Sequence, residues 1–165
     1  MLKILIFLIL FTFSNALEFN FKQTALDEFE VKGFSAAIVY KTKEDRDNQI
    51  AKLWEKIFSS DNFSVKKSKN KKLYVVYTNY KKNSFDCFIG IKSDLKIKNF
   101  ESKLIKDSKY QRGILKYEQN LNMSDIWDEI QKEKVNRNFK TDIEEYKLFD
   151  LSKSKYDVTI YLSSK

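Results

Sequence analysis

Apolar residues recur along this chain with two different periods. In residues 34–40 every second residue is apolar or aromatic, which is typical of a β-strand with one buried face. The segment after it has apolar residues on one face of a helix, at Ile50, Leu53, Trp54, Ile57 and Phe58. The chain therefore begins its patterned part with a strand followed by an amphipathic helix.

Turn and capping residues indicate where the elements of the first half end. Thr42 and Asp45 are three residues apart, as in a capping box, so we expect the helix to begin just after Thr42. Residues 73–80 and 85–91 are typical of two strands, and the polar turn between them predicts a β-hairpin. A further strand is expected over residues 18–23, before the first one.

The second part of the chain repeats this order of elements. Residues 110–117 pattern as a strand, Ser124 is a suitable N-cap for a second helix, and residues 143–149 and 156–162 pattern as a second pair of strands. Both helices carry a similar sequence around a tryptophan, LWEKI at 53–57 and IWDEI at 126–130. We therefore predict an α+β fold made of a duplicated strand-helix-strand-strand unit, with antiparallel sheets, two helices and a central cleft on a pseudo-twofold axis.

Equivalent positions of two such halves line a shared cleft. Trp54 and Tyr77 of the first half then lie near Trp127 and Tyr146 of the second. The alternative is that both tryptophans are ordinary core residues at helical spacing, and for each tryptophan taken alone a core position is the more common outcome. The periodicity leaves both alternatives open.

A carboxylate falls among these aromatic positions. Alternation within residues 142–148 places Glu144 on the same face as Tyr146 and Leu148. If this face lines the cleft, burial raises the pKa of Glu144 unless a cation or hydrogen-bond donors compensate. Because aromatic faces attract a cation by about 0.5 to 2 kcal/mol each, such a cleft suits an amphipathic, cationic small molecule.

Six short segments carry a family resemblance. They are VKGFS at 31–35, IAKLW at 50–54, YVVYTNY at 74–80, IWDEI at 126–130, DIEEY at 142–146 and VTIY at 158–161. In this order they resemble the GyrI-like effector-binding domains, which include the ligand-sensing domains of some AraC- and MerR-type multidrug regulators and integron-associated proteins. The resemblance spans roughly residues 18–162.

The resemblance implies a drug-like ligand held between the two halves. By position, Glu144 is similar to the pocket acid of the family and Tyr146 to its aromatic companion. The resemblance implies further pocket walls at Trp54, Tyr77, Tyr80 and Trp127. The chain departs from the family pattern at residues 106–109, where KDSK replaces a Pro-Ala-Gly turn, and in the first hairpin, where Phe85 or Asp86 replaces a small residue.

The first sixteen residues are typical of a secretion signal. Lys3 precedes an apolar run over residues 4–13, and Ser14 and Ala16 supply the small residues that signal peptidase recognises. The alternative is an uncleaved membrane anchor, but the run is shorter than the roughly 20 residues that span a bilayer. We predict a signal peptide over 1–16 cleaved after Ala16, and one effector-binding domain over 17–165 that is exported to the periplasm or secreted.

Composition narrows the chemistry that such a domain can perform. The chain has no histidine, which excludes imidazole catalysis and removes the usual ligand of haem and of many metals. We therefore expect no cofactor, no metal site and no catalytic residue, and a binding protein rather than an enzyme. Cys87 is the only cysteine, so it forms no internal disulfide, and alternation with Phe85 and Ile89 predicts that it packs in the core.

Two alternatives to this interpretation remain open. Some GyrI-like proteins resemble hydrolases, in which case Glu144 and Tyr146 would handle the proton. The second alternative is a protein or membrane surface that meets a basic run, although this run also fits a solvated loop. The lysines concerned are Lys66, Lys67, Lys69, Lys71 and Lys72. We expect no nucleic acid partner, because the run lacks interleaved aromatic residues, the domain is predicted to be exported, and the chain length leaves no room for a DNA-binding segment.

Overall fold

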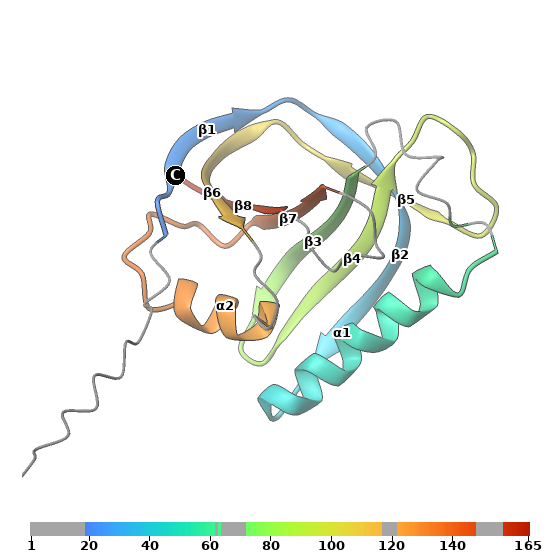
Figure 1. Ribbon diagram of the computed structural model, residues 1–165, viewed down its shortest axis with the longest axis horizontal. Helices are drawn as coiled ribbons and strands as arrows, with labels where there is room; N and C mark the ends of the chain where they lie inside the picture. The colour runs from blue at the N-terminus through green and yellow to red at the C-terminus, as the bar shows by residue number, and fades with distance from the viewer. Residues whose placement is uncertain (1–18, 62, 64–71, 117–121, 148–156) are drawn as a thin grey trace, which may run out of the picture.

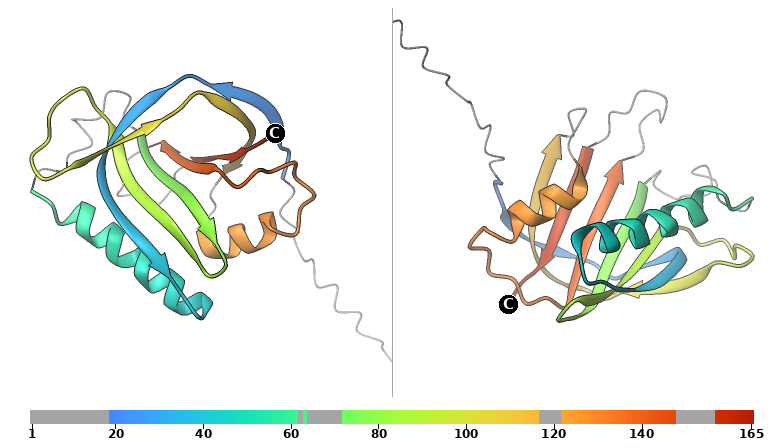
Figure 2. Two further views of the ribbon diagram at one scale, coloured as in Figure 1. Left: turned by 180° about the vertical axis from the view of Figure 1, so that it is seen from behind. Right: turned by 90° about the horizontal axis from the view of Figure 1, so that it is seen from below.

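Two helices lie on the same side of a curled antiparallel sheet in the computed structural model of the chain (Figures 1 and 2). The structure describes residues 19–61, 63, 72–116, 122–147 and 157–165. The elements are β1 (Lys22–Leu26), β2 (Phe29–Val39), α1 (Lys43–Phe58), β3 (Lys72–Lys81), β4 (Ser84–Lys92), β5 (Glu101–Ile105), β6 (Ser108–Lys116), α2 (Met123–Ile130), β7 (Thr141–Lys147) and β8 (Asp157–Ser163). The predicted α+β class is confirmed.

The strand order shows the duplication. The eight strands of the described sheet run β1-β6-β8-β7-β3-β4-β2-β5. The first half, β2-α1-β3-β4, contributes β3-β4-β2, and the second half, β6-α2-β7-β8, contributes β7-β8-β6. The two halves therefore have the same internal order, and the antiparallel pair β3–β7 joins them about a pseudo-twofold axis.

The register of β3 and β7 relates individual residues of the two halves. Val75 lies opposite Glu144 in this strand pair. With these two residues at the centre, the axis relates Tyr77 to Tyr146, since each lies two residues further along its own strand. The same operation relates Leu73 to Asp142, two residues in the other direction.

Both helices begin at a side-chain cap. The hydroxyl of Thr42 accepts a hydrogen bond of 3.1 Å from the backbone N–H of Asp45, as the capping pattern predicts. The predicted cap of α2 is wrong by two residues. The helix is capped by Asn122, whose side-chain oxygen accepts from the N–H of Ser124 (3.0 Å). The hydroxyl of Ser124 is instead engaged in contacts with the first half.

The central strands are buried on both faces, which explains the unbroken apolar run in β3. On the side of the helices, Leu53 of α1 and Ile126 of α2 pack against a core that includes Cys87, as predicted for this cysteine. On the other side, Val76 and Ile143 belong to a second buried cluster inside the curl of the sheet. Alternate residues of β3 and β7 therefore belong to the two different buried clusters, one on each face of the sheet.

The sheet is drawn together where two glycines face each other. Gly33 of β2 is paired with Gly90 of β4. A Cβ atom on Gly33 would lie 1.9 Å from the carbonyl oxygen of Ile89, so only glycine permits this close approach of the two strands. The strand at 101–105, which was not predicted from its mixed polar sequence, adds to the outer edge of β2.

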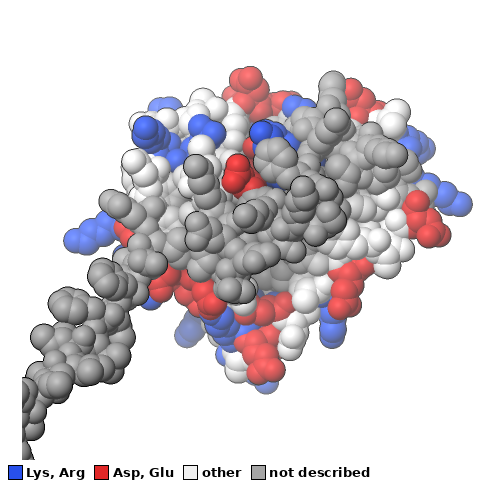
Figure 3. Space-filling view, viewed as in Figure 1, with Lys and Arg blue, Asp and Glu red and all other residues white. Residues whose placement is uncertain are grey.

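Several predictions from the sequence concern the chain termini and the surface. The signal peptide and four lysines of the basic run, Lys66, Lys67, Lys69 and Lys71, lie outside the described residues. Assigning Lys72 to the same loop is wrong, because it begins β3 and its amino group lies 2.7 Å from the carboxylate of Glu145. Acidic and basic side chains are interspersed on the face in Figure 3. In the described part of the chain no helix is long and apolar enough to cross a membrane.

Candidate functional site

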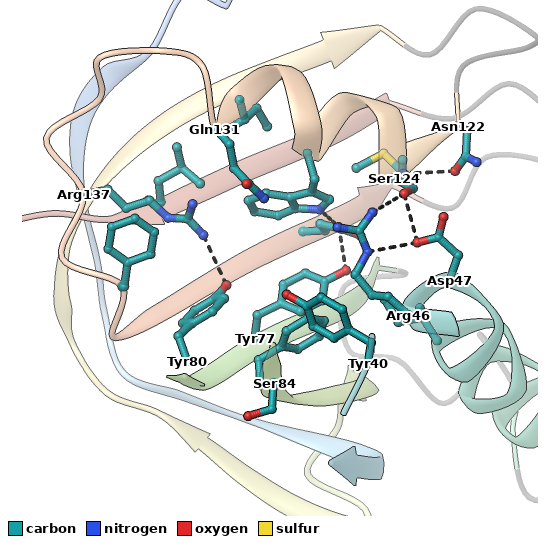
Figure 4. Close-up of a pocket in the computed structure, with 18 of the residues that line it drawn as sticks. Tyr40, Arg46, Asp47, Tyr77, Tyr80, Ser84, Asn122, Ser124, Gln131 and Arg137 are labelled. Carbon is teal, nitrogen blue, oxygen red and sulfur yellow. Dashed lines mark hydrogen bonds and ion pairs between the residues drawn. The ribbon is translucent and has the colours of Figure 1, made fainter. Parts of the chain in front are cut away.

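A cavity of about 570 Å³ lies between the two helices and the sheet (Figure 4). This volume is within the range of pockets that hold drug-sized ligands. Both halves of the duplicated unit form its walls. All six residues singled out from the sequence border it, namely Trp54, Tyr77, Tyr80, Trp127, Glu144 and Tyr146.

Glu144 lies in the middle of the sheet and points into this cavity. Its side chain is buried, with 1% of the residue exposed. One carboxyl oxygen, Oε1, accepts hydrogen bonds from the hydroxyl of Tyr77 (2.8 Å) and from the indole N–H of Trp127. The other oxygen, Oε2, accepts from the hydroxyl of Tyr146 (2.5 Å). Both oxygens are therefore held by neutral aromatic donors from both halves.

The charge of Glu144 has no counterion among the described residues. None of the ion pairs found there includes Glu144. Burial raises the pKa of its carboxyl group, and the hydrogen bonds from Tyr146, Trp127 and Tyr77 offset only part of that effect, so the pKa stays above its ordinary value. The group is consequently easier to ionise when a positive charge enters the cavity.

The two tryptophans and two tyrosines form a symmetrical arrangement around this carboxylate. Trp54 meets the ring of Tyr146 edge-on, with ring centres 5.5 Å apart and an interplanar angle of 87°. Trp127 meets the ring of Tyr77 in the same way, at 5.4 Å and 77°. Each tryptophan thus packs against the tyrosine of the other half. Both tryptophans are only partly buried and border the cavity, so they are cleft residues rather than residues wholly within the core.

Tyr80 reaches the cavity because β3 is irregular near its end. Strict alternation would place Tyr80 and Tyr77 on opposite faces of the strand. The register shifts between Thr78 and Lys81, and Asn79 in the bulge has a positive φ of 55°. This bulge turns Tyr80 toward the cavity, where its hydroxyl accepts a hydrogen bond of 3.3 Å from Arg137.

A buried ion pair that the sequence analysis did not identify lies at one end of the cavity. Arg137, in the segment between α2 and β7, donates to Oδ2 of Asp142 through Nε (3.0 Å) and Nη2. Oδ1 of Asp142 accepts from the backbone N–H of Ser163 at 2.9 Å. Asp142 lies on the same strand and face as Glu144, two residues earlier. Alternation along the strand was enough to place Asp142 on the face of Glu144. Nothing in the hydrophobic pattern indicated that Arg137 would lie beside it.

A polar bridge joins the two helices along another side of the cavity. The guanidinium group of Arg46 in α1 donates to the hydroxyl of Ser124 in α2 and lies 3.0 Å from the carboxylate of Asp47. The hydroxyl of Ser124 donates in turn to Asp47 at 2.9 Å. All three residues border the cavity (Figure 4). The bridge therefore connects the first half to the second next to the aromatic walls.

The hydroxyl and thiol groups in and near the cavity are held in their protonated forms. Burial raises the pKa of the Tyr77 and Tyr80 hydroxyls and of the Cys87 thiol well above their ordinary values, so none of them is activated as a nucleophile. Among the described residues no group of His, Cys, Asp and Glu is placed to hold a metal ion. The geometry combines a buried carboxylate with ring edges and faces around a space of ligand size.

Comparisons with known proteins agree with this architecture. The model of a protein family described as integron-associated effector binding protein, Cass2, matches residues 24–163. An integron cassette protein from the mobile metagenome of Vibrio cholerae has the same fold, with a TM-score of 0.65, 22% identity, and coverage of 89% of this chain and 97% of that chain. No curated protein matches significantly.

Two further structures with this fold differ in what they were solved with. SAV2435, bound to tetraphenylphosphonium, has a TM-score of 0.66 and 15% identity over 88% of this chain and 93% of its own. The C-terminal domain of EcmrR has a TM-score of 0.52 and 13% identity over 88% of this chain and 96% of its own. EcmrR has also been solved in a complex with DNA. The prediction that this chain has no nucleic acid partner therefore gains no support from its fold.

Proposed function

This chain belongs to the integron-associated effector-binding protein family, whose domains bind small molecules, and we propose that its ligand is an amphipathic cation held against Glu144. The single observation that carries the proposal is a buried carboxyl group whose three hydrogen-bond donors among the described residues are all neutral. Transferring a carboxylate from water into such a site is costly unless an opposite charge accompanies it. A cationic ligand supplies that charge.

The aromatic walls favour the same class of ligand. Trp54, Trp127, Tyr77 and Tyr146 surround the carboxylate with ring surface that binds apolar groups and attracts positive charge. A lipophilic cation with aromatic or alkyl groups satisfies both the rings and the acid. SAV2435, which has the same fold, was solved with a ligand of this type.

A titration of the purified domain, residues 17–165, tests the proposal. Its two tryptophans both border the cavity, so their fluorescence reports on binding there. We expect tetraphenylphosphonium to change the emission and the neutral compound triphenylphosphine oxide to bind more weakly. Glu144→Gln should reduce the affinity for the cation by about 10-fold to 100-fold, since a desolvated charge interaction contributes roughly 1.4 to 2.8 kcal/mol.

Glu145→Gln is the matched control for that experiment. Glu145 is the next residue of β7, on the opposite face, and is paired with Lys72. Its replacement should leave the affinity for tetraphenylphosphonium unchanged. Unaltered emission at high micromolar ligand, or equal affinities for the parent and Glu144→Gln, would contradict the proposal.

The hydrolytic alternative depends on the same carboxyl group and is separated from binding by the same variant. In the described site both oxygens of Glu144 are already engaged by protein donors, which favours a binding role over proton transfer. We therefore expect no release of p-nitrophenol from p-nitrophenyl esters above the buffer rate. Release that Glu144→Gln abolishes, with ligand affinity retained, would establish hydrolysis instead.

We also propose that the protein is exported, which rests on the pattern of residues 1–16 alone. Expression of the full chain in a bacterium with a periplasm should give a product that begins at Leu17. The measurement is the intact mass of the protein released from the periplasm. A product that keeps residues 1–16 and stays in the cytoplasm would overturn this part of the proposal.

A further inference from the structure

Arg137 lies at one end of the cavity in the environment that a bound cation would have. Its guanidinium carbon is 4.3 Å from the ring centre of Phe139, 5.3 Å from that of Trp127 and 5.4 Å from that of Tyr80. Figure 4 shows the side chain of Arg137 pointing into the cavity toward Tyr80. Three aromatic rings therefore surround a positive charge that belongs to the protein itself.

This resident cation is held by its own buried carboxylate. The side chain of Arg137 is 8% exposed and that of Asp142 is 0% exposed. Burial lowers the pKa of Arg137, but the hydrogen bond and the charge of Asp142 outweigh burial, so the guanidinium pKa is above its ordinary value. Arg137 consequently carries its charge at neutral pH.

The two carboxylates on β7 thus have contrasting partners. Asp142 and Glu144 lie on the same face of the strand, two residues apart, and both are buried. Trp127 contacts both environments, since its N–H donates to Glu144 while its ring lies against Arg137. The two carboxylates therefore define two adjoining anionic subsites: Glu144 borders the cavity directly, whereas Asp142 lies behind Arg137, which borders the cavity in its place.

We propose that Arg137 is a specificity-determining residue that restricts the cavity to ligands with a single positive centre, an inference that rests on the proposed function. A ligand cation can be neutralised at Glu144. A second positive centre on the same ligand would meet Arg137, whose counterion Asp142 is already engaged. Like charges in a site of low dielectric repel, so a dication should bind more weakly than a monocation of the same chain length.

A matched pair of ligands measures this restriction. Hexyltrimethylammonium and hexamethonium share a six-carbon chain and carry one and two quaternary ammonium groups. Bis-quaternary chains of four to ten methylenes cover the spacing between the two subsites. Wild-type protein should bind the monocation at least about threefold more tightly than any dication of the series, as followed by tryptophan fluorescence.

Arg137→Gln should invert this preference. Glutamine keeps a hydrogen-bond donor for Asp142 but removes the positive charge, which leaves an anionic subsite open. The ratio of dication to monocation affinity should increase by about tenfold or more. In the double variant Arg137→Gln with Asp142→Asn the increase should disappear, because the open subsite is then neutral.

A second variant tests the same inference from the opposite direction. Asp142→Asn leaves Arg137 in the cavity without its counterion, so affinity for the monocation should fall by about tenfold, whereas Glu145→Gln should not change it. The circular dichroism spectrum of Arg137→Gln and of Asp142→Asn shows whether each variant is folded. Only folded variants are used to test the inference.

Two failures are distinguishable. If tetraphenylphosphonium does not bind wild-type protein, the proposed function fails. If it binds, and the dication to monocation ratio of folded Arg137→Gln stays within about threefold of wild type, or folded Asp142→Asn binds the monocation as wild type does, the role of Arg137 is overturned while the proposed function stands.

Discussion

The two halves of the duplicated unit share one topology and contribute differently to the cavity. At the β3–β7 junction, Val75 lies opposite Glu144, and the register relates Leu73 to Asp142. At equivalent positions the first half therefore has apolar side chains where the second half has buried carboxylates. The difference shows that two halves with the same backbone fold can differ in buried charge when only a few of their equivalent side chains differ.

The aromatic residues, in contrast, stay paired. Tyr77 and Tyr146 are equivalent and donate to different oxygens of the same carboxyl group. Trp54 and Trp127 each pack against the tyrosine of the other half, but only the indole N–H of Trp127 reaches Glu144. The rings are thus common to both halves, while the acid and its third donor belong to the second half.

The largest effect is expected from making the two halves alike in charge. Val75→Glu places a second carboxylate directly opposite Glu144, where Cβ atoms of paired residues are about 5 Å apart. Two buried like charges without a counterion should lower the free energy of unfolding at pH 7 by roughly 3 to 5 kcal/mol. Urea denaturation measures this loss, and much of it should be regained near pH 4.5 as the pair binds protons.

Val75→Gln is the control, since it introduces a polar side chain of the same length without charge. It should be less destabilising than Val75→Glu at pH 7, and its loss of stability relative to the parent protein should be the same at pH 7 and near pH 4.5. Equal stability of the two variants at pH 7 would mean that the centre of the sheet tolerates a second charge, and the contrast between the halves would lose its physical basis.

The second prediction compares the equivalent tryptophans. Trp127→Phe removes a hydrogen bond to a buried carboxyl group, which should lower the free energy of unfolding at pH 7 by about 1.5 to 3 kcal/mol. Trp54→Phe keeps a ring against Tyr146 and should cost less than about 1 kcal/mol. The two values come from urea denaturation under identical conditions. Equal losses would show that the N–H of Trp127 contributes nothing beyond its ring.

The third prediction concerns the pH dependence of stability that Glu144 contributes. Burial raises the folded-state pKa of Glu144 above its ordinary value of 4.5. Its contribution to stability is then fully present below pH 4.5 and is lost as pH rises through the folded-state pKa. Relative to Glu144→Gln, the parent protein should lose up to about 1.4 kcal/mol per pH unit within that window.

The affinity for a cation should have the opposite pH dependence to the stability of the empty protein. Because the cation favours the ionised carboxylate, affinity for tetraphenylphosphonium should increase over the window in which the empty protein loses stability. Urea denaturation and fluorescence titration across a pH series measure the two trends. Glu145→Gln is the control and should retain the pH dependence of the parent. A flat difference between the parent and Glu144→Gln would rule out titration of this group.

Much of this asymmetry was accessible from the sequence, because it follows from periodicity. Alternation placed Glu144 and Tyr146 on one face, and the repeated helix sequence brought Trp54 and Trp127 to equivalent positions. The position of Tyr80 could not come from alternation, which predicts the opposite face for it. A bulge at Asn79, which has no hydrophobic signature, turns it toward the cavity.

The ion pair of the second half shows why the rest could not be predicted. Arg137 lies in a connection without periodic pattern, so its contacts depend on the path of the chain rather than on any repeat. Ser124 and Asn122 are both common capping residues, and the choice between them depends on the tertiary contact of Ser124 with Arg46. Long-range contacts therefore determine both the position of Arg137 and the N-cap of α2.

The smallest effects are expected at the polar bridge, where the halves meet through their helices. The Arg46 side chain is 13% exposed and has partners in Asp47, Ser124 and Asp128, so Arg46→Ala should lower the free energy of unfolding by about 1 kcal/mol. Lys43 is exposed and also pairs with Asp128 (2.7 Å), but solvent screens this pair, so Lys43→Ala should leave the urea midpoint unchanged. If instead the two variants lose the same free energy of unfolding, and 1 M salt abolishes both losses, exposed ion pairs would be what links the two halves. The predicted inequality would show that the part-buried contacts of Arg46, and not the exposed ion pair of Lys43, link the two helices next to the cavity.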